Sequence, residues 1–460
     1  MTFDLLTAVG ADEALAAIFT ESRAVQDWLR VEAALAHGLA AASIIDDATA
    51  ERIAGACSAE FVDLDQLWTE TAIVGYPILP LVRMICAALP DADAGFVHFG
   101  ATTQDIMDSA LALQMVDAAH RLVELVNAFG DALVILVERH EHTVMAARTH
   151  AQQAVPTTFG AKCAGFLDEL ARHRQRLSAA AAAVAVVSLF GAGGTSAALG
   201  TRAARVRAEV AARLQLGVTH VPWHVSRDRL VELMLAGAMV STMCVRFGRE
   251  VIDLTRTEVG EVAEADGMYR GASSTMPQKA NPIACELAVS FGVTAQAAAA
   301  SMFRASEAGH ERSAGEWQIE WHAIPQVCSA TAGALRAAAE IAEGLRVFPD
   351  RMAENLALDG GCIMAEAYMV ELAAQLGRHR AHETVYRAVR ESRETRASLR
   401  DALERSLSPS VWATVAPTLP VAEQYLGETS AICAAALAAW GHTRAQPLAT
   451  LGHRDEGTFG

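Results

Sequence analysis

Long stripes of apolar residues dominate the middle of the chain. The shorter stripe consists of Leu122, Val126, Phe129, Leu133 and Leu136. The longer stripe consists of Leu230, Leu233, Gly237, Val240, Cys244, Phe247, Val251 and Leu254. Because spacings of three and four residues bring side chains to one face of an α-helix, each stripe predicts a long helix with one buried face. Two further Ala-rich segments, 160–189 and 283–308, continue the pattern, which predicts a bundle of long, nearly parallel helices.

The two ends of the chain show shorter helical patterns. Prolines at positions 77, 80 and 90 interrupt the first part, and the helices shorten again after Phe348-Pro349-Asp350. We find no alternating apolar and polar run long enough to predict a strand. The expected fold is therefore all-α with three helical domains. These are an N-terminal domain over 1–104, a central helix bundle over 105–350 with a prominent loop near 266–282, and a C-terminal domain over 351–460.

Composition and charge exclude several classes of function. The net charge of −17 argues against a nucleic-acid surface, which needs clustered Lys and Arg. The eight cysteines are scattered without a CxxC pair, which predicts free thiols in a reducing cytoplasm. The N-terminus lacks the basic stretch of a signal peptide, and the uncharged run near 178–200 is broken by glycines, so no membrane partner is expected. Helices this long and apolar are hard to cover within one chain, which predicts a homo-oligomer.

Three polar segments interrupt the helical pattern, at 98–105, 148–153 and 271–282. The third contains two Pro, two Ser and a Gly, which favour a loop. Lys279 and Asn281 offer the cationic and amide donors that hold a carboxylate. Ser273 and Ser274 can donate to an oxyanion, or one can act as a base if the site stabilises an alkoxide. On composition alone, an ordinary Ser/Pro linker explains this segment equally well.

The order of residues adds a family resemblance. Residues 273–282 read Ser-Ser-x-Met-Pro-x-Lys-x-Asn-Pro, which resembles the signature loop of the fumarase/aspartase superfamily. The pattern His-x-Gly-x-Thr-Thr-x-Asp at 98–105 and the pattern Arg-Thr-His-x-Gln at 148–152 resemble the other two conserved segments of that superfamily, in the same order. Residues 310–321, with the segment 28–35, look most like the 3-carboxy-cis,cis-muconate cycloisomerase branch, with adenylosuccinate lyase next.

The resemblance implies an assembly and a chemistry. It implies a homotetramer in which four central domains form one twenty-helix core, and active sites shared among three subunits. The implied reaction is β-elimination or its reverse addition on a di- or tricarboxylate, through an aci-carboxylate intermediate. Such an intermediate is stabilised by donors aimed at the carboxylate, and the resemblance implies no metal or cofactor.

The resemblance also implies roles for individual residues. Ser273 matches the catalytic base, Lys279 and Asn281 the groups that grip the reacting carboxylate, His150 a proton donor or water holder, and Glu286 the carboxylate that pairs with this histidine. The predicted catalytic residues are thus Ser273, His150, Lys279 and Glu286. The predicted substrate-binding residues are Thr102, Thr103, Gln104, His98, Arg148, Gln152, Ser274, Met276, Asn281 and Arg312. For Arg148, His98 and Arg312, a purely structural role stays open.

Departures from the family pattern bear on the substrate. Ala272 stands where many members have Gly, and Gln278 and Ala280 replace the His and Arg that commonly flank the lysine. Tyr76 occupies the place of a histidine in adenylosuccinate lyases. The loss of a cation disfavours a tricarboxylate unless Arg148, Arg304 and Arg312 point inward.

Three hypotheses follow. The first is a fumarate-forming lyase that cleaves a C–N or C–O bond of a substituted succinate. The second is 3-carboxy-cis,cis-muconate cycloisomerase, and a remote third is a non-catalytic, crystallin-like relative.

Overall fold

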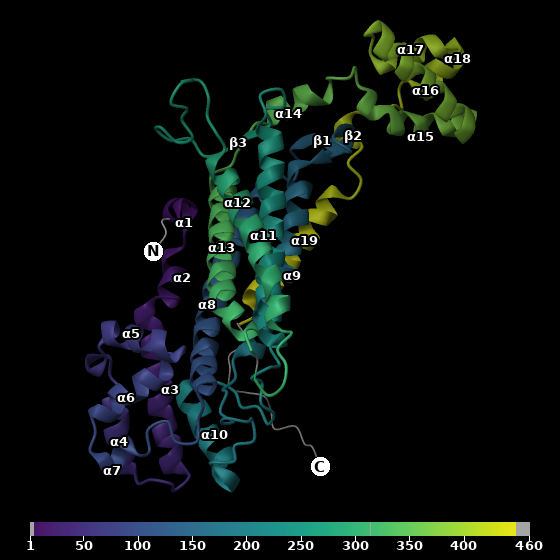
Figure 1. Ribbon diagram of the computed structural model, residues 1–460. Coiled ribbons are helices and arrows are strands. Elements are labelled where there is room, and N and C mark those ends of the chain that lie inside the picture. The colour runs from purple at the N-terminus through teal and green to yellow at the C-terminus, as the bar shows by residue number, and fades with distance from the viewer. Residues whose placement is uncertain (1–3, 313, 448–460) are drawn as a thin grey trace, which may run out of the picture.

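Five long helices form the body of the protein. The computed structural model describes residues 4–312 and 314–447. The bundle consists of α8 (Thr103–Arg139), α9 (Phe159–Val184), α11 (Asp228–Thr255), α12 (Ile283–Ala305) and α13 (Glu316–Gly344), which lie side by side (Figure 1). These helices cover both apolar stripes and most of the two Ala-rich segments, although α9 ends at Val184 and α12 at Ala305, before the predicted ends at 189 and 308. The predicted all-α fold with a long-helix bundle is confirmed.

Aromatic rings and small residues together determine how closely the bundle helices approach. The Phe247 ring of α11 lies 5.1 Å from that of Phe129 on α8 and 5.3 Å from that of Phe166 on α9, between ring centres. At Gly292 of α12, an added Cβ would come within 2.8 Å of the Ser241 carbonyl oxygen of α11. A glycine is therefore needed where α11 and α12 are in closest contact, and van der Waals packing holds these helices.

Shorter helices cover both ends of the bundle. Near the start of α8 lie α3 (Glu21–Ala41), α4 (Asp47–Ala56), α5 (Leu64–Val74), α6 (Ile78–Ala87), α7 (Asp91–Ala94) and α10 (Ala203–Leu214). Helices α1 (Leu5–Gly10) and α2 (Glu13–Ile18) lie along the side of the bundle, where Arg336 of α13 donates to the Gly10 carbonyl oxygen at 3.1 Å. Beyond the opposite end lie α14 (Pro349–Leu356), α15 (Ala365–Leu376), α16 (Arg378–Thr395), α17 (Leu399–Ser406) and α18 (Pro409–Val415). The last helix, α19 (Thr429–Ala445), returns along the bundle and packs on α9 and α8 (Figure 1).

The apolar cores follow packing rather than chain order. The core around α3 includes Val206, Val210 and Leu214 of α10, a helix within the segment 105–350. The core of the bundle includes Cys433 and Trp440 of α19, a helix within the segment 351–460. A compact core of its own holds α15 to α18. The division at residues 104 and 350 stays a prediction, but α10 and α19 each pack across one of these boundaries.

The expectation that the chain has no strands is wrong at one place that matters. Strands β1 (Val144–Thr149) and β2 (Gln152–Thr158) form an antiparallel hairpin, and β3 (Val262–Ala263) pairs with β4 (Arg346–Val347). The hairpin turn places His150 at φ 51° and Ala151 at φ 63°. Two left-handed residues fit the two-residue turn that joins twisted strands, but the usual Asn-Gly signal is missing from this sequence.

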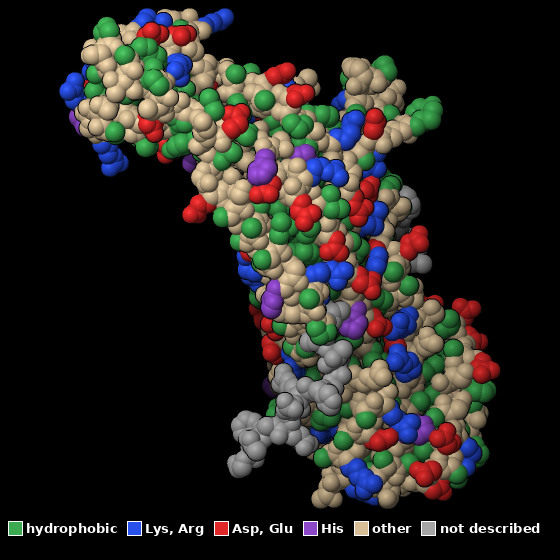
Figure 2. Space-filling view, turned by 180° about the vertical axis from the view of Figure 1, so that it is seen from behind, with side chains coloured by type: hydrophobic (Ala, Val, Ile, Leu, Met, Phe, Trp, Pro, Cys, Tyr) green, Lys and Arg blue, Asp and Glu red, His purple; other side chains and the backbone are tan. Residues whose placement is uncertain are grey.

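The surface carries mixed charge. On the face shown in Figure 2, basic and acidic side chains alternate along the bundle, and the described residues of this face form no continuous basic surface. Two helices, α11 and α12, are long and apolar enough to cross a membrane by length and composition alone. The most apolar window of α11 is 72% buried inside the protein, as a core helix requires, whereas that of α12 is only 44% buried.

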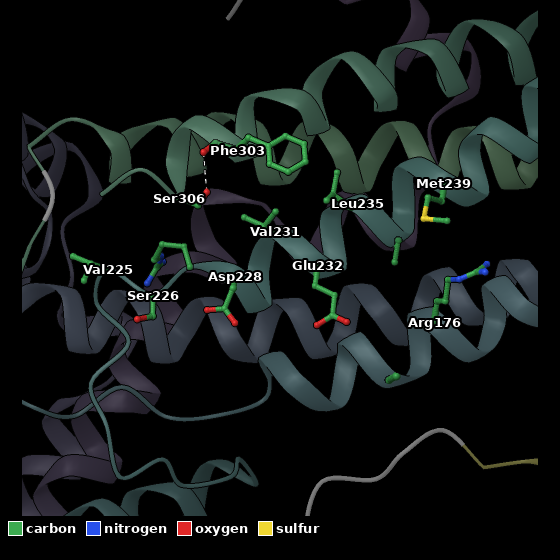
Figure 3. A pocket seen from close by; sticks show the side chains of 13 residues that line it. Arg176, Val225, Ser226, Asp228, Val231, Glu232, Leu235, Met239, Phe303 and Ser306 are labelled. Carbon is green, nitrogen blue, oxygen red and sulfur yellow. Dashed lines mark hydrogen bonds between the residues drawn. The ribbon is translucent and has the colours of Figure 1, made fainter. Parts of the chain in front are cut away.

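A groove runs along the exposed side of the bundle (Figure 3). It has a cavity volume of about 770 Å³ and lies between α9, α11 and the end of α12. Two large apolar side chains on its wall are half exposed, Met239 at 46% and Phe303 at 54%. Arg176 and Glu232 provide its charged edge. The groove thus combines exposed apolar side chains with a charged edge.

Candidate active site

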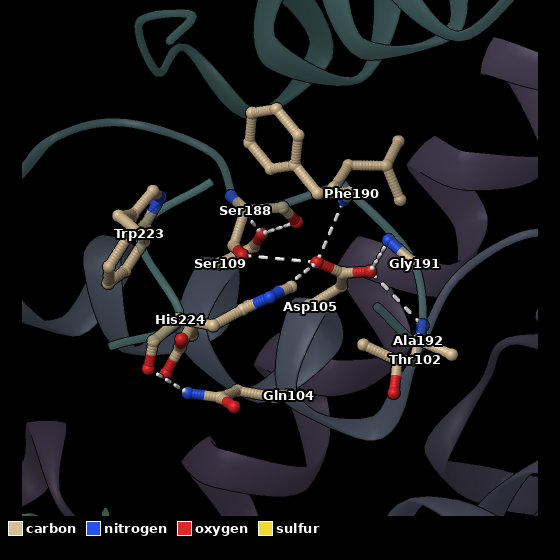
Figure 4. A network of polar contacts seen from close by, with 12 residues as sticks. Thr102, Gln104, Asp105, Ser109, Ser188, Phe190, Gly191, Ala192, Trp223 and His224 are labelled. Carbon is tan, nitrogen blue, oxygen red and sulfur yellow. Dashed lines mark hydrogen bonds and ion pairs between the residues drawn. The ribbon is translucent and has the colours of Figure 1, made fainter. Parts of the chain in front are cut away.

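The first polar segment is fixed by Asp105, which is fully buried at the start of α8 (Figure 4). Its Oδ1 accepts hydrogen bonds from the Phe190 backbone N–H at 3.0 Å and from Ser188 Oγ at 3.1 Å, and lies 2.7 Å from His224 Nε2. Its Oδ2 accepts from the backbone N–H groups of Gly191 at 2.8 Å and Thr102 at 3.1 Å. A buried carboxylate with five donors ties the segment 188–191 to the first turn of α8.

The threonines and the glutamine beside Asp105 differ in exposure. Thr102 is 9% exposed, and its Oγ1 accepts a hydrogen bond from Arg312 Nη1 at 2.8 Å. Thr103 is half-buried. Gln104 is 1% exposed, and its amide donates to the His224 carbonyl oxygen at 2.8 Å. Of these three predicted substrate-binding residues, Gln104 is thus the one whose side chain is enclosed within the chain.

His98 and Arg312 lie beside the same segment. The His98 Nδ1 lies 2.6 Å from Glu32 Oε1 of α3. Burial lowers the pKa of His98, but the charge of Glu32 and the hydrogen bond to it outweigh burial, so the pKa lies above its usual value. Arg312 also donates to the Ala192 carbonyl oxygen at 3.1 Å, and its Nε is buried without a partner among the described residues. Arg312 therefore brings a permanent positive charge to Thr102, and the surroundings of His98 favour its charged form.

Tyr76 belongs to an aromatic cluster near this segment. Its ring stacks on Trp317, with centres 5.9 Å apart and an interplanar angle of 20°, and meets Trp321 edge-on at 6.1 Å. The Tyr76 hydroxyl accepts a hydrogen bond from Gln318 Nε2 at 3.3 Å. The ring is 37% exposed. Tyr76 thus joins the short helices near α5 to the first turn of α13.

The second segment forms the tip of the β1–β2 hairpin. His150 and Gln152 are exposed at the turn. The Arg148 side chain points elsewhere, because both of its Nη atoms bind the Glu261 carboxylate, Nη2 at 2.5 Å and Nη1 at 2.9 Å. Glu261 is fully buried and also accepts from Asn355 Nδ2 at 2.7 Å. Arg148 therefore anchors the hairpin, whereas His150 is free to meet a substrate or another chain.

The third segment is a loop closed at its base. The Asn281 backbone N–H donates to the Gly271 carbonyl oxygen at 2.8 Å, and Ala272 pairs with Ala280. Gly271 has φ 63°, and a Cβ there would come 2.3 Å from the Asn281 carbonyl oxygen. Only glycine fits this position. The required glycine therefore precedes Ala272, the residue that departs from the family pattern.

Within the loop, the two serines have different surroundings. Ser273 is half-buried, and its Oγ accepts hydrogen bonds from the backbone N–H groups of Met276 at 3.1 Å and Thr275 at 3.3 Å. Ser274 is exposed, and its hydroxyl lies 3.5 Å from Thr275 Oγ1. Donors aimed at an oxygen stabilise negative charge on it. The geometry therefore favours an alkoxide at Ser273 rather than at Ser274.

The remaining residues of the loop are open to solvent. Lys279 and Met276 are exposed, Asn281 is half-buried, and Glu286 lies exposed in the first turn of α12. Buried Glu264 fixes this turn, because it accepts from the Cys285 backbone N–H at 2.8 Å. Arg304, at the far end of α12, is bound to Glu307 at 2.7 Å and is 73% exposed. Arg304 therefore lies far along the helix from Lys279.

The structure does not bring the three segments together within one chain. The first segment begins α8, and the hairpin with His150 follows its end. Thirty-seven residues of helix, at about 1.5 Å each, separate the two by about 55 Å. The loop with Ser273 lies near the hairpin end of the bundle (Figure 1). Residues 98–105 and Arg312 thus form one half of the candidate site, and the other residues lie at the opposite end.

Sequence reasoning missed the buried carboxylates that fix these groups. Glu32 carries a signal, because it stands between buried residues on the apolar side of an amphipathic helix. Glu261 carries none, since its partner Arg148 is 113 residues away. A buried acid needs a partner, but the pattern around it does not identify that partner.

Comparisons with known proteins give the family. A family model described as Lyase matches residues 7–297. A relative from Pseudomonas aeruginosa named 3-carboxy-cis,cis-muconate cycloisomerase is 39% identical over 427 residues, which cover 92% of this chain and 93% of the relative.

Solved structures agree with this assignment. The 3-carboxy-cis,cis-muconate lactonizing enzyme of Pseudomonas putida has a TM-score of 0.89 at 34% identity, covering 96% of this chain and 100% of that one. The fumarate lyase of Mesorhizobium sp. BNC1 has a TM-score of 0.86 at 36% identity, covering 93% and 98%. The resemblance seen in the three polar segments thus extends over nearly the whole chain, which belongs to the fumarase/aspartase superfamily of lyases.

Proposed function

We propose that this protein catalyses the closure of 3-carboxy-cis,cis-muconate to its lactone, the second of the hypotheses drawn from the sequence. The observation that carries the proposal is the 39% identity over 92% of the chain to a protein named for this reaction. The first hypothesis, a fumarate-forming lyase that cleaves a C–N or C–O bond, has the support of a solved fumarate lyase at 36% identity, whose name specifies neither bond. The fold common to the solved relatives provides the scaffold for either reaction.

The charges of the candidate site support a tricarboxylate. The sequence appeared to lack cations because Ala280 replaces an arginine. Arg148 and Arg304 do not supply the missing charge, since Glu261 and Glu307 hold them. His98 and Arg312 do supply it, one with a raised pKa and the other permanently charged. With Lys279 from the loop, two permanent cations and a histidine whose surroundings favour its charged form match three carboxylates.

The reaction follows from the placement of these groups. A substrate carboxylate oxygen forms a bond to an alkene carbon, and the electron pair of that double bond moves toward the neighbouring carboxylate to give the aci-carboxylate. Lys279 and Asn281 stabilise this charge. The Ser273 hydroxyl gives its proton to the carbon beside the aci-carboxylate, and the N–H groups of Thr275 and Met276 hold the resulting alkoxide until water reprotonates it. In the reverse direction the same alkoxide is the base.

The site is completed by other copies of the chain, as a homotetramer with each site shared among three subunits. The separation of about 55 Å along α8 supports this part of the proposal, because one chain cannot join His150 to Thr102. The half-exposed apolar window of α12 supports it too, as does the groove beside Met239 and Phe303 (Figure 3). Burial of these side chains against partner helices removes apolar surface from water. The eight free thiols fit a cytoplasmic location.

A fumarate-forming lyase is the second candidate. The observation that favours it is the solved fumarate lyase, which matches 93% of this chain at 36% identity. That reaction uses the same Ser273 base on a substituted succinate and needs only two carboxylate grips. The third cation of the site would then have no carboxylate partner in the substrate.

A substrate panel tests the proposal. The purified protein is given 3-carboxy-cis,cis-muconate and, separately, a set of N-, O- and S-substituted succinates. We expect loss of the diene absorption of the muconate with lactone as product, and a kcat/KM at least a hundredfold above that for any succinate. Fumarate release from a succinate without lactone formation would overturn the proposal in favour of the second candidate.

A further inference from the structure

A buried acid stands behind the candidate site. Glu32 lies in the middle of α3, 2% exposed, between the buried residues Val31 and Leu35. Its Oε1 lies 2.6 Å from Nδ1 of His98, a residue 66 positions away in the chain. Burial of a carboxylate in an apolar helix face costs several kcal/mol unless a hydrogen bond or a cation compensates for it. His98 is the group that provides this compensation.

The position of His98 is itself constrained. Its backbone has φ 61°, the left-handed region that non-glycine residues seldom adopt. The turn that holds it leads through Gly100 to Thr102, where Arg312 binds. Its Nε2 makes no hydrogen bond to any of the described residues, and the side chain stays 21% exposed. One ring nitrogen is thus held from behind, and the other is left for a ligand.

The charged groups around His98 are mainly acidic. Glu32 contributes from α3 and Asp105 from the first turn of α8, and both raise the pKa of the imidazole against the effect of burial. The thiols of Cys57 and Cys86 lie near Glu32 and are neutral, because burial raises their pKa values. Arg312 is a nearby cation, since it binds Thr102 Oγ1 at 2.8 Å. Asp105 is already engaged with five donors, so Glu32 is the acid that determines the state of the ring.

We propose that Glu32 is a positioning residue of the enzyme, which holds His98 as an imidazolium with its Nε2–H left for a carboxylate of the substrate. The inference rests on the proposed function, because it assigns the ligand of Nε2 to the carboxylate substrate. The physical reason is charge balance. The anion of Glu32 is satisfied by the Nδ1–H bond, and the positive charge of the ring is then available to a second anion on its other side.

The experiment uses full-length protein with 13C-labelled histidine. The NMR signal that disappears in His98→Gln belongs to His98, and its titration in the wild-type protein gives the pKa directly. We expect a value above the usual 6.5, and a lower value in Glu32→Gln, which keeps the shape of the side chain and removes its charge. Glu51→Gln is the matched control. Glu51 of α4 lies 3.9 Å from His37, which is on α3 like Glu32, but the Glu51 side chain is 75% exposed. This control should leave the His98 titration unchanged.

Kinetics then connect the pair to the substrate. In Glu32→Gln, we expect KM for the muconate to rise about tenfold for each pH unit by which the pH exceeds the lowered pKa of His98. The kcat of this variant should stay within about threefold of wild type. Glu32→Asp, which keeps the charge, should restore the wild-type profile in part. A pH profile of KM in Glu32→Gln that matches Glu51→Gln would overturn the inference, as would a wild-type His98 pKa below 6.5. The titration needs no substrate, so its result stands apart from the panel assay that decides the proposed function.

Discussion

Arg148 and Glu261 form a two-point ion pair that joins the β1–β2 hairpin to the segment between α11 and β3. The two Nη atoms of Arg148 lie 2.5 and 2.9 Å from the two carboxylate oxygens of a fully buried Glu261. Asn355 of α14 donates to the same carboxylate at 2.7 Å. Three parts of the chain, at 148, 261 and 355, therefore share one buried charge.

Arg148→Met should destabilise the protein by about 3 kcal/mol, because it leaves the buried Glu261 carboxylate without its cation. Thermal unfolding measures the loss. Arg148→Met/Glu261→Gln removes the unpaired charge and should recover most of it. If Arg148 is instead a substrate contact, the single variant should keep its Tm and show a raised KM.

Ser273→Ala should lower kcat by about a thousandfold or more with the fold intact, because it removes the base but little volume. Ser274→Ala is the matched control and should keep more than about a tenth of the activity, since its hydroxyl lacks the two backbone donors. Steady-state kinetics on the preferred substrate of the panel give both values. The reverse result would assign the base to Ser274.

Lys279→Met should reduce kcat more than it raises KM. The charge on the gripped carboxylate increases only as the aci-carboxylate forms, so the exposed Lys279 contributes most in the transition state. Separate measurement of kcat and KM tests this. A raised KM with unchanged kcat would make Lys279 a contact for the bound substrate alone.

Mixed tetramers should regain activity that neither parent has. Ser273→Ala and His150→Gln are each expected to be inactive, but after exchange of subunits about a quarter of the sites combine two intact residues if chains assort at random. The rate after mixing, compared with each variant alone and with gel filtration of the wild type, provides the test. A fully active monomer would falsify the shared site.

The contact of α2 with the bundle should weaken in acid. The hydrogen bond from Arg121 lowers the pKa of the buried Asp12, which also caps α2 through the Leu15 N–H at 2.9 Å. A lowered folded pKa gives a stabilisation that is present above the unfolded value of about 4 and is lost as the pH falls through the folded value. Asp12→Asn should therefore lower the Tm at pH 7, and this difference should shrink as the pH falls below about 4.

Asp4→Asn is the control for that experiment. Asp4 caps α1 in the same way, with its carboxylate accepting from the Thr7 N–H, but the group is exposed and has no arginine partner among the described residues. Its Tm should stay close to that of wild type at every pH. A Tm difference between Asp12→Asn and wild type that is as large at pH 3 as at pH 7 would contradict the proposed link.

The features that could be predicted from the sequence are those that depend on the local spacing of apolar and polar residues. The apolar positions from Leu230 to Leu254 repeat every three or four residues, and α11 covers them all. The loop at 271–282 was predicted from its local composition, because its prolines and serines disfavour a helix. Local periodicity reports which face of a helix is buried, and that information was sufficient for the bundle.

Features that depend on distant partners were not predictable. The hairpin turn uses His150 and Ala151 in left-handed conformations, and neither residue signals such a turn. The role of Arg148 depends on Glu261, and the state of His98 depends on Glu32, in each case more than 60 residues away. Electrostatic partners are chosen by the folded arrangement, whereas the pattern of a single sequence describes neighbours along the chain.

The length of α8 has a consequence for how such enzymes change over evolutionary time. Thr103 begins this helix and Arg139 ends it, so the residues before and after it act about 55 Å apart and, in the proposed assembly, in different active sites. If a substitution near Thr102 is compensated by one near His150, the two substituted side chains would then be in contact only between separate copies of the chain. Correlated substitutions between these two segments would therefore report contacts between subunits. A structure prediction for a single chain that treated them as contacts within that chain would be wrong.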